Sequence, residues 1–151
     1  MKQKINVRLI GIAVLAVLAT LICMTCVYYS LFQKQVRKDL QVQAQVLGET
    51  GAFQNVQTRP KSSDIAKEDL RITWIDTDGT VLYDNDADAN MLENHANRPE
   101  VKSALQTGEG ECVRTSNTMN MTTFYYALRL ENGMVLRVAT QARSIWNVFL
   151  T

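Results

Sequence analysis

The sequence contains few of the residues that build disulfide scaffolds or hydrolytic active sites. Its 151 residues include three cysteines, two prolines and one histidine. A small domain held together by disulfides is excluded, because three cysteines are few and odd in number. One histidine, with no nucleophile elbow and no oxyanion-hole motif, gives no basis for nucleophilic catalysis. A phosphate-cradling glycine motif is also missing. We therefore predict no catalytic machinery and no bound cofactor in this chain.

Acidic residues are scarce in the first part of the chain and exceed basic residues in the second. Residues 1–63 carry eight Lys and Arg against two Asp and Glu, whereas residues 64–151 carry eight against thirteen. The near-neutral formal charge of +1 therefore hides a basic, apolar part followed by an acidic part. An acidic globular part repels phosphate groups, which excludes nucleic acid as a partner.

An uncharged run from Leu9 to Gln33 predicts a transmembrane helix. The run has twenty-five residues, and roughly 20 helical residues span a bilayer. We place the membrane segment at residues 9–32, with Tyr29 at its far interface, and the basic tail of residues 1–8 in the cytoplasm. A cleaved signal peptide has a similar basic start, but its apolar region is shorter and ends at a small-residue cleavage site that this run lacks.

A narrow apolar stripe follows the membrane segment and predicts a juxtamembrane helix over residues 33–57. The other positions of this segment are mostly polar, and such a helix is marginal alone. We expect it to pack against a partner, either its own acidic domain or the same helix of a second copy. The linker signature of Thr58–Asp64 then separates it from the globular part. The stripe consists of Val36, Leu40, Ala44 and Leu47.

Residues 64–140 predict one small α+β domain with five antiparallel strands. Asp78 and Gly79 form a turn between the first two strands, and Asn132 and Gly133 predict a two-residue type I′ turn before the last strand. Two strands, a helix and three further strands give a five-stranded antiparallel sheet with a helix on one face, which is a PAS-like layout. The expected strands are Leu70–Asp76, Thr80–Asp84, Glu111–Ser116, Thr122–Leu130 and Met134–Thr140.

The helix of this domain has start and stop signals of its own. Asn97 is the expected N-cap, Pro99 lies in the first turn, and Glu100 is the expected capping-box partner of Asn97. Gly108 is the expected C-terminal glycine. After the last strand, residues 141–151 become increasingly apolar. We expect them to form an exit helix and the start of a second transmembrane helix, so that the chain is a fragment, although an amphipathic cap helix is the alternative.

An acidic loop supplies the candidate ligand-binding residues. Asp84, Asp86 and Asp88 place oxygen ligands at alternate positions, as an EF-hand loop begins, but the glycine and the final glutamate of that loop are absent. A solvated polar loop and a weak divalent-cation site both remain open. His95 could report external pH. Arg98 either fixes the helix start or pairs with an anionic ligand.

Two motifs give the sequence a family resemblance. Asp76–Asp84 has the pattern D-x-x-G-x-V-L-x-D, and Asn94–Val101 has the pattern N-H-x-x-R-P-E-V. With the strands of Phe124–Thr140, these resemble the extracytoplasmic PAS-like, or single-Cache-like, sensor region of bacterial sensor histidine kinases similar to the phosphate-regulon sensor. The resemblance covers roughly residues 5–151. It implies a kinase part outside this chain, a parallel homodimer, and a response regulator reached only through that kinase part.

Two functions therefore stay open. The first is the signal-input region of a membrane-bound two-component kinase, with residues 33–140 outside the plasma membrane. The second is a stand-alone anchored domain that binds a partner protein at the cell surface. An in-frame second apolar run and a histidine-containing helix encoded after Thr151 would favour the first, and a stop codon would favour the second.

Overall fold

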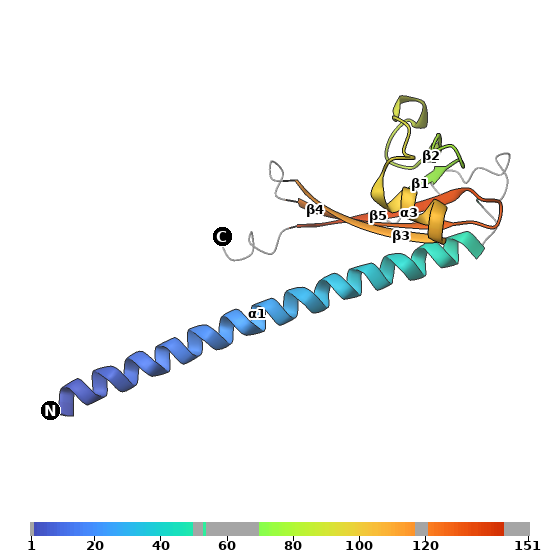
Figure 1. Ribbon diagram of the computed structural model, residues 1–151. Helices are drawn as coiled ribbons and strands as arrows, with labels where there is room; N and C mark the ends of the chain where they lie inside the picture. Colours follow the sequence, from blue (N-terminus) through green and yellow to red (C-terminus); the bar gives the residue numbers. More distant parts are fainter. Residues whose placement is uncertain (1, 50–52, 54–69, 117–120, 144–151) are drawn as a thin grey trace. The chain divides into compact units, whose positions relative to one another are not determined.

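The computed structural model describes residues 2–49, 53, 70–116 and 121–143 (Figure 1). The chain divides into two compact units, Met1–Val36 and Arg37–Thr151. The elements in chain order are helix α1 (Lys2–Glu49), strands β1 (Arg71–Ile75) and β2 (Val81–Asp84), the 3₁₀ helix η2 (Ala89–Met91), helix α3 (Pro99–Thr107), and strands β3 (Glu109–Ser116), β4 (Met121–Arg129) and β5 (Val135–Arg143).

Helix α1 contains the predicted membrane segment. Within Asn6–Glu49 its most apolar 18-residue window has a mean hydropathy of 2.7, and the helix is long and apolar enough to cross a membrane. None of the residues in its most apolar window is buried against protein. The hydroxyl groups of Thr20 and Thr25 donate to carbonyl groups one turn earlier in the same helix. Polar groups satisfied within the helix are what a hydrocarbon environment requires.

The second unit is built on a five-stranded sheet in the order β2-β1-β5-β4-β3, and every neighbouring pair is antiparallel. The last strand, β5, therefore lies in the centre, between the first strand and β4. Helix α3 lies on one face of this sheet (Figure 1). The predicted α+β fold, with a long N-terminal helix, five antiparallel strands and a covering helix, is confirmed.

Strand register gives the sheet two faces of different chemistry, because alternate side chains point to opposite sides. We call one the apolar face and the other, which carries α3, the polar face. A dry cluster of Ile75, Val101, Ala104, Ala127 and Val135 joins α3 to one end of the polar face. The apolar face carries Ile72, Trp74, Tyr83, Phe124, Tyr126, Leu136 and Val138.

The end of α1 that belongs to the second unit packs on the apolar face. Leu40 and Ala44 are buried, and Leu40 lies beside Phe124 and Tyr126. Phe53 is also buried and meets the ring of Trp74 edge to face, with centroids 6.0 Å apart. The predicted apolar stripe therefore finds a partner in its own domain, and helix α1 is described as far as Glu49.

Both predicted hairpin turns exist, but the second one differs in type. Gly133 N donates to Leu130 O, and Leu130 N donates to Met134 O, so the loop has three residues and not the two that were predicted. The first hairpin has the same pattern between Asp76 and Thr80. In each loop the glycine has a positive φ, 89° at Gly79 and 84° at Gly133. A three-residue loop that ends in a left-handed glycine suits the twist of the strands.

Two further expectations need correction. The N-cap of α3 is Arg98 and not Asn97, no side chain caps the helix, and the Glu100 carboxylate pairs with arginines of the sheet. Strand β5 continues to Arg143, so residues 141–143 extend the sheet and do not begin an exit helix. Pairing with β4 supplies backbone partners that a helix start would lack. The expected linker, the end of the juxtamembrane segment and residues 144–151 lie outside the described residues.

The two hairpin glycines give a matched test of the fold. A Cβ at Gly79 would lie 2.4 Å from Asn94 Oδ1 and 2.5 Å from the backbone N of Ala96, whereas a Cβ at Gly133 would meet nothing closer than 3.4 Å. Replacing either by alanine costs about 1–2 kcal/mol for the left-handed backbone. At Gly79 we expect a further loss of about 1–3 kcal/mol from overpacking. Denaturant unfolding of the full chain in micelles measures both losses, and equal losses would contradict the close contact at Gly79.

Candidate functional site

Charged and polar side chains gather on the polar face of the sheet, from the first turn of α3 across to strand β2, where a second apolar core would otherwise be expected. Thr73, Asp84, Glu100 and Arg137 are all buried there. Buried charges are stable only when they are paired and hydrogen-bonded. We call the whole group the polar cluster: it consists of Arg71, Thr73, Asp84, Glu100, Arg114, Tyr125 and Arg137.

Glu100, in the first turn of α3, is the centre of this polar cluster. Its side chain is fully buried, and its Oε2 accepts a hydrogen bond from Arg114 NH2 on β3 at 2.6 Å. Its Oε1 lies 3.5 Å from Arg137 NH1 on β5. One carboxylate therefore links the helix to two strands of the sheet.

The ring of Tyr125 on β4 lies under both guanidinium groups. The Cζ of Arg114 is 4.4 Å from the ring centroid, and the Cζ of Arg137 is 5.4 Å from it. A cation over an aromatic face is attracted by the ring quadrupole. The ring and the Glu100 carboxylate thus offset the repulsion between two neighbouring positive charges.

The polar cluster continues to the opposite edge of the sheet through Thr73 and Asp84. Arg137 NH2 donates to Thr73 Oγ1 at 3.0 Å, and Thr73 Oγ1 donates to Asp84 Oδ2 at 2.8 Å. Arg71 Nε contacts both carboxylate oxygens of Asp84 at 3.1 Å. A connected path of polar contacts therefore runs from β2, where the acidic loop begins, to β3.

The two arginines around Glu100 respond differently to their environments. Burial lowers the pKa of Arg137 below its ordinary value and Arg71 adds to this effect, while Glu100 opposes it. Partial burial is the largest single effect on Arg114 and lowers its pKa, but the Glu100 carboxylate, together with Tyr125 and Cys112, raises the pKa above its ordinary value. Arg137 is thus the less well compensated cation, although both remain charged at neutral pH.

The predicted acidic ligands do not converge on one point. Asp84 is buried and accepts from Arg71, from Thr73 and from the backbone N–H groups of residues 86 and 87. Asp88 caps η2 by accepting from Asn90 N, and Asp86 is exposed, 3.6 Å from Arg71 NH1. Within the described residues no group of three His, Cys, Asp or Glu side chains is placed to hold a metal ion. The weak divalent-cation site stays a prediction.

His95 lies in the loop before α3 and is only 5% exposed. Its Nδ1 lies 2.6 Å from Glu93 O, which must accept, so Nδ1 carries the proton. Its backbone N donates to Gly79 O and joins the loop to the first hairpin. Burial lowers the pKa of His95 below 6.5, and the charges of Arg137 and Arg98 lower it further, against opposing effects of Glu93 O and the Glu100 carboxylate. Arg98 itself serves as the N-cap residue of α3.

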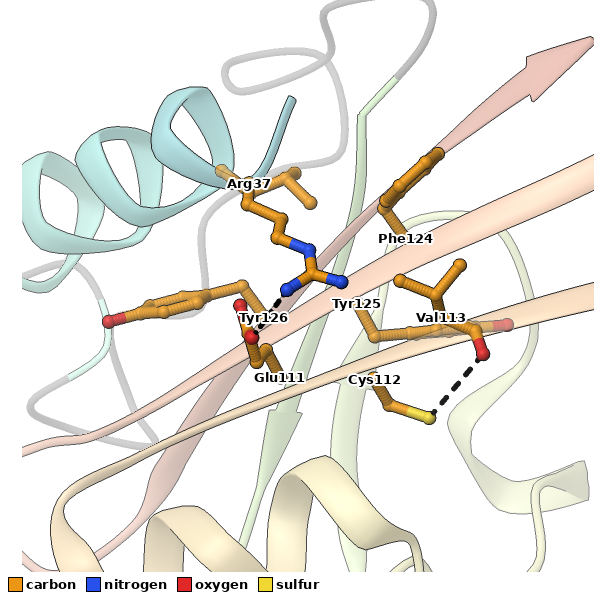
Figure 2. Close-up of a pocket in the computed structure, with 8 residues that line it drawn as sticks. Arg37, Glu111, Cys112, Val113, Phe124, Tyr125 and Tyr126 are labelled. Carbon is orange, nitrogen blue, oxygen red and sulfur yellow. Dashed lines mark hydrogen bonds and ion pairs between the residues drawn. The ribbon is translucent and has the colours of Figure 1, made fainter. Parts of the chain in front are cut away.

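A second contact, between α1 and the β3–β4 edge, lies on the apolar face. Arg37 NH1 on α1 and Glu111 Oε1 on β3 form an ion pair at 2.8 Å (Figure 2). The cleft beneath it is lined by Leu40, Val113 and Phe124 and has no space for a water molecule. Close packing of this kind holds the helix end on the sheet.

Tyr126 adds a polar contact beside this cleft. Its hydroxyl donates to Glu109 at 2.5 Å, and burial together with that carboxylate raises the pKa of Tyr126 far above its ordinary value. The hydroxyl therefore stays protonated at all physiological pH values. Tyr126 and Glu109 lie on neighbouring strands, so the bond also fixes the end of β3 against β4.

Sequence reasoning found the acidic loop, His95 and Arg98 but missed the centre of the polar cluster. Glu100 was interpreted as a capping residue, and Arg114 and Arg137 were not singled out. A signal existed in β5, because Arg137 stands between Leu136 and Val138 in the apolar first part of that strand. An arginine at such a position is buried only if a carboxylate reaches it, and the partner, thirty-seven residues away in sequence, could not be identified from spacing.

The family model described as Single Cache-like matches residues 26–134, which is more than half of the chain. This range includes the end of the apolar segment, all of α3 and four of the five strands. No curated protein matches the sequence.

His95 gives the domain a defined pH dependence. Because its pKa is lowered by folding, the unfolded chain binds a proton first, and the free energy of unfolding falls as pH drops below 6.5. The slope reaches at most about 1.4 kcal/mol per pH unit. Denaturant unfolding between pH 7.5 and 5.5 measures it. As His95 is the sole histidine, His95→Gln should remove the slope in this window, and an unchanged slope would contradict the assignment.

Proposed function

Because the chain belongs to the single Cache-like family, we propose that it is the extracytoplasmic signal-input region of a membrane-bound sensor histidine kinase. Domains of this family are typically extracellular sensor domains of signalling proteins. The link to a histidine kinase, and to kinases similar to the phosphate-regulon sensor, comes from the two motifs of Asp76–Asp84 and Asn94–Val101. The catalytic reaction would belong to a kinase part outside these 151 residues.

The observation that carries this proposal is the continuity of α1. One unbroken helix contains both the apolar segment and the residues that pack on the sheet, from Lys2 to Glu49. Leu40 and Ala44 are buried, and Arg37 pairs with Glu111. A helix transmits displacement along its axis because its backbone hydrogen bonds resist local compression. In this proposal, a change in the sheet would be passed along α1 toward its apolar segment.

Strands β3 and β4 connect the polar cluster to this helix. Arg114 and Tyr125 point to the polar face, whereas Glu111 and Tyr126 of the same two strands point to the apolar face, where α1 packs. A ligand that favours one arrangement of the polar cluster would bias the position of these strands. The same shift would then change the contacts that Arg37 and Leu40 of α1 make with the sheet.

The proposal includes an orientation and a set of partners. Lys2, Lys4 and Arg8 favour a cytoplasmic N-terminus, which places residues 33–140 outside the plasma membrane. The protein would act as a parallel homodimer and would reach its response regulator through the kinase part. A stand-alone anchored domain that binds another surface protein is the alternative, and the experiments below separate the two.

Surface labelling tests the orientation. Met91 is 83% exposed at η2, so Met91→Cys, in a chain whose own cysteines are replaced by alanine, should react with a membrane-impermeant maleimide in intact spheroplasts. Gln3→Cys should react only after permeabilisation, because we place it in the cytoplasm. Labelling of Gln3→Cys alone in intact spheroplasts would reverse the orientation.

A chimaera tests the coupling. The chain is fused, in place of the native input region, to the kinase part of another sensor, and autophosphorylation is measured in membranes. Arg37→Glu or Glu111→Arg creates like charges at the α1–β3 contact. We expect either change to alter basal output about two- to fivefold, the scale of an exposed ion pair, and the double exchange to restore it.

Lys38→Glu provides the matched control for the chimaera. Lys38 undergoes the same change of charge at the next helical position but is exposed, so its output should stay near that of the parent. Failure of the double exchange to restore output would exclude this ion pair from transmission. A kinase that responds to none of the variants would favour the stand-alone domain.

A further inference from the structure

Arg137 is a buried cation whose hydrogen bonds are incomplete. Its side chain is only 4% exposed, yet Nε has no hydrogen-bond partner among the residues that the structure describes. Its contact with Glu100 is 3.5 Å long, and its one shorter bond goes to the neutral hydroxyl of Thr73. A guanidinium in this position is expected to bind a carboxylate through two parallel N–H donors. The Arg137 guanidinium therefore has a capacity to bind an anion that its present contacts do not fill.

The Glu100 carboxylate fills the space between the two arginines in the manner of a bound ligand. It is fully buried and makes a short contact with Arg114 and a long one with Arg137. The geometry favours one arginine because the carboxylate is tied to the backbone of α3 through its side chain. A free carboxylate has no such tether and could contact both guanidinium groups closely.

We propose that Arg114 and Arg137, over the ring of Tyr125, form a binding site for a small free carboxylate, and that Glu100 is its resident, tethered competitor. The proposal rests on the proposed sensor function and names the ligand class of its site. Exchange of the Glu100 carboxylate for a free one would keep the charge of the polar cluster unchanged. It would also break the ion pairs that link α3 to β3 and β5.

Access to this site is from the Arg114 side. Arg114 is 32% exposed, whereas Arg137 is almost completely enclosed. A carboxylate would therefore meet Arg114 first and then reach Arg137. Tyr125 is partly exposed beside both arginines and supplies a flat wall for the apolar part of the ligand.

The backbone of α3 is held in place by packing as well as by Glu100. A Cβ at Gly110 would lie 2.1 Å from Glu100 O and 2.8 Å from Ser103 Cβ, so the first turn of α3 lies directly on β3. Val101 and Ala104 are fully buried in the neighbouring dry cluster. Removal of the Glu100 side chain beyond Cβ should therefore leave an acetate-sized space and not a collapsed helix.

Chemical rescue tests the proposal on the full chain in nanodiscs. Glu100→Ala should lower the melting temperature, because it leaves two buried or half-buried guanidinium groups without their carboxylate. Sodium acetate should raise the melting temperature of this variant by about 4 °C or more over sodium chloride of equal ionic strength, with saturation. Wild type should respond little, since its own carboxylate competes.

Three variants control the rescue. Glu100→Gln fills the same space with a neutral amide and should not respond to acetate. Glu93→Ala removes an exposed carboxylate nearby and should also not respond. Arg114→Gln in the Glu100→Ala background should abolish the response, because it removes the cation at the entrance. A response of Glu100→Ala that is no larger than that of Glu93→Ala would overturn the proposal.

A second measurement covers the case in which Glu100→Ala does not fold. In the wild-type chain, concentrated acetate should shift the Nε–Hε resonance of Arg137 and the ring resonances of Tyr125 along saturable curves, and Arg114→Gln should remove the effect. Linear, unsaturated shifts would overturn the proposal. Neither measurement involves a kinase, so their failure would leave the signal-input function standing, and failure of the chimaera would leave a positive rescue intact.

Discussion

A fully buried carboxylate remains charged only when cations surround it, and Glu100 imposes this requirement at the centre of the domain. Two strands must each bring an arginine to the same point, and α3 must begin where its first turn meets both. The position of Gly110 follows from this demand, since no side chain fits between β3 and Glu100 O. The polar cluster therefore sets the place of α3 as well as the chemistry of the sheet face.

The two faces of the sheet have different roles. On the apolar face, burial of Leu40, Phe53 and Trp74 removes nonpolar surface from water, at roughly 25 cal/mol per Å². On the polar face the ion pairs contribute little net stability, because desolvation offsets much of their attraction. Stability therefore comes mainly from the helix contact and the dry cluster, while the polar cluster supplies a specific geometry that a bound anion can alter.

The strands, the hairpins and the helix were predictable from the sequence, but their exact ends and hydrogen bonds were not. Alternation over Phe124–Leu130 and the two Asx-Gly pairs predicted strands and hairpins that the structure confirms. Three predictions were wrong: the two-residue loop at Asn132, the N-cap at Asn97, and the exit helix beginning at residues 141–143. Each of these features depends on partners in other parts of the fold. Local signals place a turn or a helix within a few residues, but tertiary pairing decides its final hydrogen bonds.

The sequence by itself determined that an apolar helix precedes an acidic α+β domain, because hydropathy, charge and strand periodicity are local properties. It also determined that His95 and Arg98 lie next to the helix start. Only the tertiary structure decided that Glu100 is buried between Arg114 and Arg137 and that Asp84 is paired with Arg71. These contacts join residues 13 to 37 positions apart, and which strand lies beside which depends on the free energy of the whole packed sheet.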